Sequence, residues 1–539
     1  MELAKNQEHT VTIEGYGEGG MGVARINGCV VFVHGALRGE KCRVLILKTL
    51  KNAAFAKAVE ILEPSDARIA PDCPYFPRCG GCTFRHMRYE EELRLKKQRV
   101  QDNLSRIGGS GAAVEEILGA QDTLRYRNKA QYPVSADGAV GFYRARTHEV
   151  IECRYCLLVR PEAEAAAEAL RGYMQACRVT GYDERTGRGL IRHLYVRSNA
   201  AGESLICVLV NGGGLPEEEK LVALLRAACP ECVGIVLGTN TKKGNVILGD
   251  RYRTLWGEAW IEDTLCGRAF RLSVPSFYQV NRAQAERLYQ KAIEFAALTG
   301  KETVLDLYCG AGTITLAMAG HAGRVLGAEI VPEAVADARG NAARSGVQNA
   351  EFFCGDASDV AKKLAQEKLR PDVITVDPPR KGLAADVVES IAAMQPECVV
   401  YVSCDSATLA RDVKRFADLG YIAKRACAVD MFPRADHTET VCLLSKLQSK
   451  EHIEIEVKMD EMDLTSAESK ATYEEIKAYV LEHTGLKVSH LYIAQVKQKY
   501  GIIERENYNK PKSEDTRQPQ CPPEKEKAIT EALRHFGMI

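Results

Sequence analysis

Residues 303–405 repeat one pattern, in which a short apolar run ends at a carboxylate or a reactive side chain. Each run is rich in Val, Ile and Leu at consecutive positions, which is typical of parallel strands buried on both faces. Ligands of open α/β sheets bind beyond the carboxyl ends of the strands. We therefore expect an α/β fold whose functional site lies at one edge of the sheet, near the residues that end the runs: Asp306, Glu329, Asp356, Asp377 and Cys404.

The first of these runs turns through two glycines, Gly310 and Gly312, into a helical segment. Such a turn brings backbone N–H groups close to a nucleotide-like ligand. The third glycine of the dinucleotide fingerprint is replaced by Thr315, which counts against NAD. Glu329 is well placed to accept hydrogen bonds from ribose hydroxyls. Together the strands indicate a class I methyltransferase (Rossmann-like) sheet that binds S-adenosylmethionine, although each Asp alone would serve equally well as a helix cap or turn residue.

The run 399–405, Val-Val-Tyr-Val-Ser-Cys-Asp, places a thiol where the last parallel strand opens onto the site. Cys404 is therefore a candidate nucleophile. The competing interpretation is a small buried apolar side chain, which is the commoner role of a single cysteine.

Residues 10–62 alternate short β-rich runs with glycine turns, and five such strands suggest a small OB-like β-barrel. The glycines of 15–22 and the closing Pro64-Ser65 make residues 1–64 resemble a TRAM domain, a module found on RNA-modifying enzymes. An interaction barrel of another kind is the alternative.

Cys73, Cys79 and Cys82 are spaced like metal ligands, and Cys156 is available as a fourth, with Cys153 as its competitor. Zinc and a [4Fe–4S] cluster both accept four cysteines, so the spacing leaves both open, together with chance clustering among 19 cysteines. We expect a reducing cytoplasmic location, because the N-terminal residues lack a signal-peptide core and no run of about 18 apolar residues is present.

Residues 65–275 are expected to form an α+β middle domain that carries the cysteines. Residues 125–132 and 141–146 interleave cations with aromatic and amide side chains, a mixture that binds RNA phosphates and stacks on bases. The basic segment 85–106 is expected to be a helix with a solvated face. Further along, the periodicity predicts helices and strands at 162–177, 190–197, 204–210, 232–238, 252–261 and 283–297.

Several motifs in this order resemble the RNA uracil-C5 methyltransferases of the TrmA/RumA/RlmD type over about residues 10–446. The matching segments are 277–281 (Phe-Tyr-Gln-Val-Asn), 306–310, 377–382 (Asp-Pro-Pro-Arg-Lys-Gly), 401–405, 411–412, 430–433 and 437–439 (His-Thr-Glu). The resemblance implies a methyltransferase domain over 276–446. It also implies methyl transfer to C5 of a uridine through a covalent adduct between the nucleophile and C6.

On this resemblance Cys404 is the nucleophile and Glu439 is the general base. Without the resemblance, Glu439 would be interpreted as a surface carboxylate on an edge strand. The expected S-adenosylmethionine contacts are Gln279, Tyr308, Glu329 and Asp377. The cluster ligands fall on Cys73, Cys79, Cys82 and Cys156, which favours [4Fe–4S] over zinc.

The expected partner is RNA, with no membrane and no protein partner implied. The TRAM-like and cysteine segments favour 23S ribosomal RNA by resemblance. Two alternatives remain, namely the same reaction on a transfer RNA uridine and an inactive RNA-binding iron–sulfur protein. The net charge of zero implies no partner by itself.

Asp405 and Arg434-Ala435 depart from the family pattern, in which Asn and Gln-Ser/Thr are common, and this puts substrate contacts near them in question.

Residues 447–539 lie beyond the resemblance. Residues 450–463 are expected to be a charged linker, and 472–483, 488–500 and 524–536 have helical spacing. We interpret this tail as a small helical interaction module. Its cations offer an RNA contact as the alternative: Lys497, Lys499, Arg505, Lys510 and Lys512.

Overall fold

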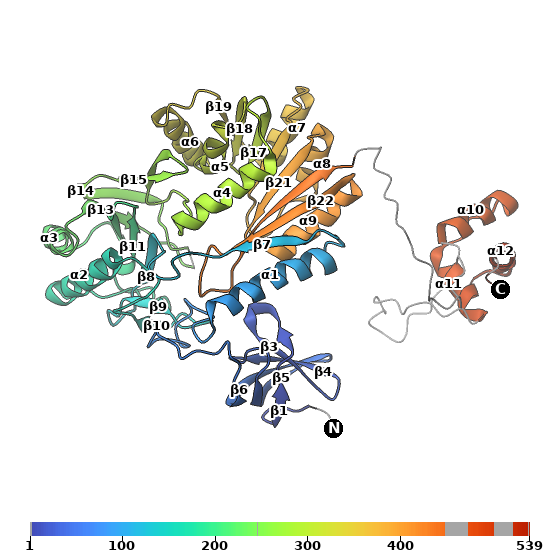
Figure 1. Cartoon of the computed structure of the whole chain (residues 1–539), viewed down its shortest axis with the longest axis horizontal. Coiled ribbons are helices and arrows are strands. Elements are labelled where there is room, and N and C mark those ends of the chain that lie inside the picture. The colour runs from blue at the N-terminus through green and yellow to red at the C-terminus, as the bar shows by residue number, and fades with distance from the viewer. Residues whose placement is uncertain (1–2, 245, 448–472, 501–520, 537, 539) are drawn as a thin grey trace. The chain divides into compact units, whose positions relative to one another are not determined.

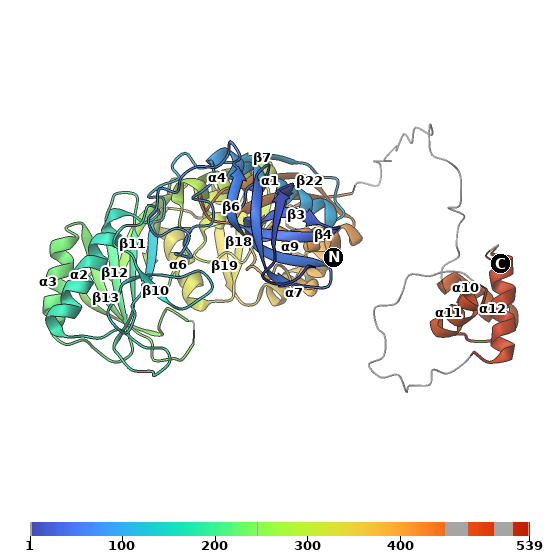
Figure 2. The ribbon, with the colours of Figure 1, turned by 90° about the horizontal axis from the view of Figure 1, so that it is seen from below.

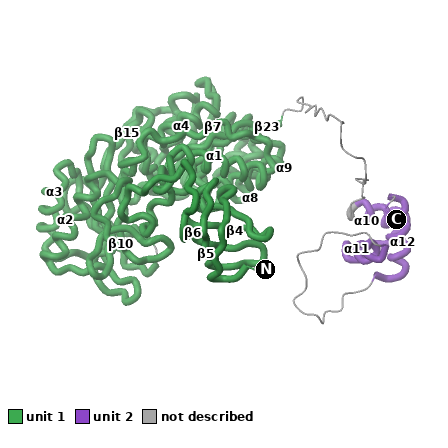
Figure 3. The backbone as a smooth tube through the Cα atoms, turned by 60° about the horizontal axis from the view of Figure 1, so that its bottom comes forward, with its two compact units in different colours: residues 1–451 green, residues 452–539 purple. Residues whose placement is uncertain are grey.

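The computed structural model describes residues 3–244, 246–447, 473–500, 521–536 and 538. The chain divides into two compact units, residues 1–451 and 452–539 (Figure 3). None of the helices within these described ranges is long and apolar enough to cross a membrane.

The centre of the larger unit is an eight-stranded sheet with the order β19-β18-β17-β20-β21-β23-β22-β7 (Figure 1). The first five strands in this order, namely β19, β18, β17, β20 and β21, are parallel. Strand β23 then runs antiparallel to both of its neighbours, and β7, from far earlier in the chain, adds parallel to β22. The bounds are β7 Val114–Leu118, β17 Thr303–Leu307, β18 Arg324–Glu329, β19 Ala350–Cys354, β20 Val373–Val376, β21 Cys398–Ser403, β22 Tyr421–Val429 and β23 Glu439–Lys446.

Helices cover both faces of this sheet, so successive strand residues enter opposite cores. Val304 and Val400 pack against one helix layer, whereas Leu305 and Val399 pack against the other. This explains the uninterrupted apolar runs and confirms the predicted α/β sheet. The first layer is α4 Arg282–Ala296, α5 Thr313–Ala319 and α6 Pro332–Arg344; the second is α1 Tyr89–Arg106, α7 Ala357–Gln366, α8 Ala385–Met394 and α9 Ser406–Asp418.

The N-terminal sheet has six strands where the sequence predicts five, because the glycine-rich segment 15–22 contributes the short β2 and the start of β3. Its order is β1-β5-β6-β4-β3-β2, and β1 also approaches β3, so that the sheet curls around its own apolar core. The bounds are β1 Glu8–Thr12, β2 Gly15–Tyr16, β3 Gly22–Ile26, β4 Cys29–His34, β5 Lys41–Thr49 and β6 Ala53–Glu63.

The middle segment forms a five-stranded sheet with the order β14-β13-β12-β11-β8. One face packs on α2 and α3 (Figure 2), and the other joins the core shared with the large sheet. Two hairpins, β9-β10 and β15-β16, complete it. The bounds are β8 Lys129–Pro133, β9 Gly141–Tyr143, β10 Val150–Glu152, α2 Pro161–Cys177, β11 Ile191–Ser198, β12 Ser204–Val210, α3 Glu218–Ala228, β13 Cys232–Thr239, β14 Arg251–Gly257, β15 Trp260–Leu265 and β16 Arg268–Ser273.

Two expectations for this segment are wrong. The single strand expected over 252–261 is split between β14 and β15 at Gly257, whose φ of 65° ends the extended conformation. The solvated helix face expected over 85–106 is also wrong in part, since α1 buries Glu92 and Lys96 completely. A basic helix is usually solvated, but here acidic partners from another segment cover it.

The described part of the smaller unit contains three helices, α10 Tyr473–Thr484, α11 His490–Lys499 and α12 Pro523–His535, which confirm the helical spacing. They enclose a small core that includes Ile476, Ile493 and Ile529. Lys497 is buried. The expected linker 450–463 and three cations of the tail, Arg505, Lys510 and Lys512, lie outside the described residues. The domain bounds 1–64, 65–275, 276–446 and 447–539 stay predictions.

Candidate active site

Cys404 and Glu439 are brought together by the antiparallel insertion of β23. Cys404 directly follows β21, and Glu439 is the first residue of β23. Ser403 pairs with Thr440 in the ladder between these strands. The thiol and the carboxyl are therefore one position beyond the last pair, at the carboxyl edge of the parallel strands.

Glu439 is almost completely buried, so it is not a surface carboxylate. Burial raises the pKa of its carboxyl to about 8, the Asp377 carboxyl adds to the rise, and Arg380 opposes it. Burial, followed by the effect of Asp306, likewise raises the pKa of Asp377 to about 7. A carboxyl with such a pKa can take up a proton near neutral pH, which is the property of a general base.

Cys404 is half-buried beside these carboxyls. Burial is the main cause that raises the pKa of its thiol to about 11, with contributions from Glu439 and Asp377, while Arg380 lowers it. The thiol is thus protonated at neutral pH, and the nearby cation is what favours the thiolate. Arg380 also lies 3.2 Å from His437, measured from Nη2 to Nε2. Sequence reasoning gave Arg380 no role, although it stands inside the Asp-Pro-Pro-Arg-Lys-Gly motif.

The turn after β17 leaves room for a ligand. Tyr308 and Gly310 both have positive φ, and no atom lies within 4 Å of the place where a Cβ on Gly310 would stand. Glu329 accepts hydrogen bonds from the N–H groups of Gly310 (3.1 Å) and Val331 (2.9 Å). Each of its oxygens retains a lone pair for a further donor such as a hydroxyl. The turn therefore fits a nucleoside-like ligand.

Other acids of the repeated pattern have structural roles. Asp306 is fully buried and accepts hydrogen bonds from Thr315 (2.5 Å) and Thr375 (3.1 Å), tying α5 and β20 to β17. Asp356 caps α7 through the N–H of Ser358. For Asp356 the alternative interpretation as a helix cap holds, whereas Asp306 is neither a cap nor a turn residue and instead joins three elements through its carboxyl.

Gln279 lies in the loop before α4, and the structure buries it there. Asn128 donates from Nδ2 to the Gln279 carbonyl (2.9 Å) and from its backbone N–H to Val280 (2.8 Å). Asn281 caps α4 and donates to the Met431 carbonyl at 3.2 Å. The motif 277–281 is therefore held between the start of β8 and the loop that precedes Glu439.

The contacts of the residues that depart from the family pattern indicate structural roles and not substrate binding. Asp405 caps α9 by accepting the N–H groups of Ala407 (2.9 Å) and Thr408 (3.0 Å), a task that Asn performs equally well. Arg434 turns toward the segment just before α1, where Nη1 donates to the Met87 carbonyl at 2.9 Å.

The three cysteines spaced like metal ligands line one cavity of about 230 Å³, which both candidate fourth ligands, Cys153 and Cys156, also line. The Gly81 N–H donates to the sulfur of Cys79 at 3.4 Å. A hydrogen bond from the Cys153 thiol lowers the pKa of Cys156 below its ordinary value. The sulfurs come from Cys73, Cys79, Cys82, Cys153 and Cys156.

Within the described ranges no group of three His, Cys, Asp or Glu residues could hold a single metal ion. A tetrahedral zinc ion needs all its sulfurs about 2.3 Å from one centre. In a [4Fe–4S] cluster the cysteines sit around a larger core. The arrangement of the cysteines around this cavity therefore differs from that of a tetrahedral zinc site.

Comparison with known proteins agrees with this geometry. A model of the tRNA (uracil-5-)-methyltransferase family matches residues 253–447, and a TRAM-domain model matches residues 3–59. An uncharacterized RNA methyltransferase of Clostridium acetobutylicum is 39% identical over 452 residues, covering 83% of this chain and 98% of the relative. One from Listeria monocytogenes is 42% identical over 446 residues, covering 82% and 98%. This chain belongs to the RNA uracil-C5 methyltransferase family.

The methyltransferase also resembles a solved structure, the tRNA (uracil-54, C5)-methyltransferase of Pyrococcus abyssi in complex with S-adenosyl-L-homocysteine. The TM-score is 0.66 at 25% identity, and the match covers 81% of this chain and all of that one. The enzyme is thus an S-adenosylmethionine-dependent RNA (uracil-C5-)-methyltransferase with a TRAM domain.

Arg380 should control the reactivity of Cys404. Replacing it by Met removes the cation that opposes the rise of the thiol pKa, so less thiolate is present at pH 8. We expect Cys404 to be alkylated about threefold more slowly, since the guanidinium is exposed and its field is screened by solvent. Peptide-resolved mass spectrometry after timed iodoacetamide treatment measures this rate.

Arg380→Lys keeps the charge, and Lys381→Met removes the neighbouring cation, so both variants should react like the wild type. An unchanged rate in Arg380→Met, or an equal loss in Lys381→Met, would contradict a specific effect of Arg380.

Proposed function

We propose that the enzyme transfers a methyl group to C5 of a uridine in 23S ribosomal RNA through a covalent bond between Cys404 and C6. The observation that carries this proposal is the placement of a thiol and a buried carboxyl of raised pKa opposite each other, one position beyond the last ladder pair of β21 and β23. One group can attack the ring, and the other can remove a proton from it.

C5 of uracil is too weakly nucleophilic to be methylated unaided. Addition of the Cys404 thiolate at C6 forms the S–C6 bond and moves the C5–C6 π electrons into an enolate, which makes C5 nucleophilic. Bound S-adenosylmethionine supplies an electrophilic methyl group. Attack by C5 on this methyl carbon would form the C5–CH3 bond as the bond to the sulfonium sulfur breaks, with S-adenosylhomocysteine as the leaving group, and would leave an adduct with both a methyl group and a hydrogen at C5.

Glu439 then removes the hydrogen from C5 as a proton. The C–H electrons restore the C5–C6 double bond, the S–C6 bond breaks, and Cys404 leaves as a thiolate. The raised pKa of Glu439 makes its carboxylate a stronger base than an ordinary Glu, and the ionised form predominates only above a pH of about 8 in the ligand-free protein.

We propose that Gln279, Tyr308, Glu329 and Asp377 contact the methyl donor. The space beside Gly310 and the remaining lone pairs of Glu329 support this assignment. The S-adenosyl-L-homocysteine bound to the Pyrococcus abyssi enzyme supports the ligand class.

Transfer RNA is the second candidate substrate. It is favoured by the name of the matching family model and by the Pyrococcus abyssi enzyme, which acts on a transfer RNA uridine. The TRAM domain and the cysteine cavity support the ribosomal RNA proposal by resemblance. The inactive RNA-binding alternative is disfavoured by the presence of Cys404 and Glu439 together. For either RNA, the target base must leave its stack at a cost of a few kcal/mol.

We also propose that Cys73, Cys79, Cys82 and Cys156 hold a [4Fe–4S] cluster that orders the middle segment around RNA. The methyl transfer described above moves no single electrons, so the reaction requires no redox role.

Nucleoside mass analysis tests the substrate proposal. We expect 5-methyluridine in 23S ribosomal RNA after incubation with the wild type and S-adenosylmethionine, and none with Cys404→Ala, which lacks the attacking sulfur. Both RNAs must come from cells that lack the enzyme. Product confined to transfer RNA would keep the mechanism and overturn the substrate, and no product on either RNA would contradict the proposed function.

The cluster proposal predicts that Cys79→Ser, purified without oxygen, loses iron and sulfide and binds RNA more weakly. The exposed Cys354, outside the cavity, provides the matched control Cys354→Ser. Iron analysis and RNA filter binding measure both effects. A folded, iron-free Cys79→Ser protein with wild-type RNA affinity would contradict the ordering role.

A further inference from the structure

The loop 430–438 joins β22 to β23 and ends at Glu439. In the ladder between these strands Val429 pairs with Glu439, so Asp430 begins the loop directly beside the proposed base. The position of Glu439 therefore depends on what holds the two ends of this loop.

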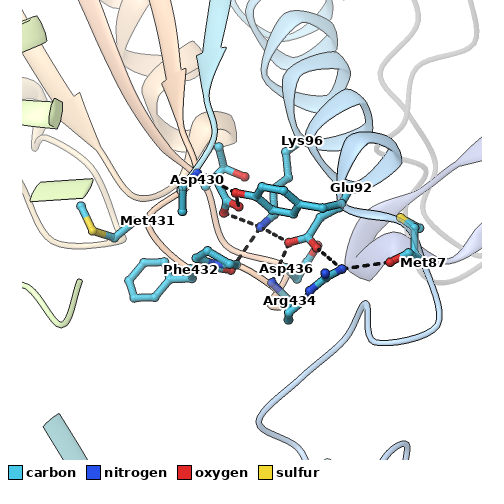
Figure 4. A network of polar contacts seen from close by, with 12 residues as sticks. Met87, Glu92, Lys96, Asp430, Met431, Phe432, Arg434 and Asp436 are labelled. Atoms are coloured by element: carbon cyan, nitrogen blue, oxygen red, sulfur yellow. Dashed lines mark hydrogen bonds and ion pairs between the residues drawn. The ribbon is translucent and has the colours of Figure 1, made fainter. Parts of the chain in front are cut away.

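Lys96 of α1 holds the first end (Figure 4). Its ammonium donates to Asp430 Oδ1 (2.6 Å), to Glu92 Oε1 (2.8 Å) and to the Phe432 carbonyl (3.2 Å). An ammonium has three donors, so all of them are used. The side chains of Lys96, Glu92 and Asp430 have no solvent exposure.

Arg434 brings the second cation to the same cluster. Its backbone N–H donates to Glu92 Oε1 at 2.7 Å, and its guanidinium lies 3.6 Å from Glu92 Oε2. Two cations thus face two carboxylates. The Arg434 carbonyl accepts the N–H groups of Thr83 and Phe84, which follow Cys82 in the chain. The backbone at Arg434 has a φ of 70°, a conformation that these contacts hold in place.

The same helix face also holds the far end of the loop. Arg99 donates to Asp436 Oδ1 at 2.5 Å and to Thr438 Oγ1 at 3.3 Å. Glu92, Lys96 and Arg99 are spaced by four and three residues, which places them on one side of α1.

We propose that Lys96 is a positioning residue for the general base, holding the loop 430–438 so that Glu439 reaches C5 of the adduct. This inference rests on the proposed function. A buried ion cluster adds little net stability compared with apolar packing, because desolvation offsets the attraction between the charges. The ion cluster instead fixes the position of the loop, since each of its hydrogen bonds forms only when the loop lies in one place.

Displacement of the loop 430–438 should slow one step of the reaction. Attack by Cys404 and methyl transfer use groups outside the loop 430–438. Only removal of the C5 proton, with release of the sulfur, requires Glu439. A displacement of the base by about 1 Å can slow its step about a hundredfold. Loss of Lys96 should therefore leave the first covalent bond intact and delay its cleavage.

The test is quenched-flow analysis of the full-length enzyme with substrate RNA and S-adenosylmethionine, with the covalent protein–RNA complex resolved by denaturing electrophoresis. In Lys96→Met we expect wild-type formation of the complex, its accumulation at steady state, a fall in kcat of ten- to a hundredfold, and a parallel fall in KM, so that kcat/KM stays at the wild-type value. Lys97→Met is the matched control, because Lys97 lies on the same helix, is only partly buried, and donates to the Glu115 carbonyl of β7, outside the cluster. It should behave like the wild type.

A second variant separates position from charge. In Lys96→Met/Glu92→Gln only Asp430 and Arg434 remain charged in the cluster, so the double variant is electrically balanced again. We expect it to recover thermal stability without recovering kcat. Recovery of both would show that Lys96 serves only the charge balance, and would overturn the positioning role.

If Lys96→Met does not fold, Tyr89→Phe tests the positioning role in its place, because it removes one hydroxyl that donates to Asp430 Oδ2 at 2.7 Å. The complex should accumulate there too, to a smaller extent, and its absence would overturn the inference. Slower formation of the complex, in place of slower cleavage, would overturn it as well. Absence of any covalent complex in Glu439→Gln would instead contradict the proposed function itself.

Discussion

The antiparallel pairing of β23 between β21 and β22 is the constraint on which the site depends. Parallel strands bring Glu329, Asp377 and Cys404 to one edge of the sheet, but all of these approach from the same direction. Strand β23 runs the opposite way, so its first residue, not its last, reaches that edge. This is how Glu439 comes to oppose Cys404 although 35 residues separate them in the sequence.

The enzyme treats buried carboxyls in two contrasting ways. Glu92 and Asp430 each lie against the Lys96 ammonium, and Arg434 adds a second cation. Burial raises the pKa of both Asp377 and Glu439 toward neutrality. The charge of Asp377 adds to the rise for Glu439, which the exposed Arg380 opposes, and the charge of Asp306 adds to the rise for Asp377. The first pair can hold a loop in place, whereas the second can exchange protons. The loop 430–438 connects the two pairs, because Asp430 of the first pair begins it and Glu439 of the second pair follows it.

Much of the sheet could be predicted because strands buried on both faces must be apolar throughout. The segment 204–210 and the end of β18 at Glu329 illustrate this. Side-chain partners that come from distant segments could not be predicted. Lys96 has the pattern of a solvated helix, and only Asp430, 334 residues away, explains its burial. The pairing of β7 with β22 is equally invisible to local periodicity. The roles of Asp405 and Arg434 likewise emerged only from their contacts with helices α9 and α1.

The most direct test of the account is the intact mass of the Glu439→Gln enzyme after incubation with substrate RNA and S-adenosylmethionine. Glutamine cannot accept the C5 proton, so the account predicts a stable species bonded through Cys404, whose mass equals protein plus RNA plus CH2, that is, the added methyl group less the thiol proton. The additional substitution Cys404→Ala should abolish it. Normal turnover by Glu439→Gln, or an adduct on another residue, would contradict the assignment of these two groups.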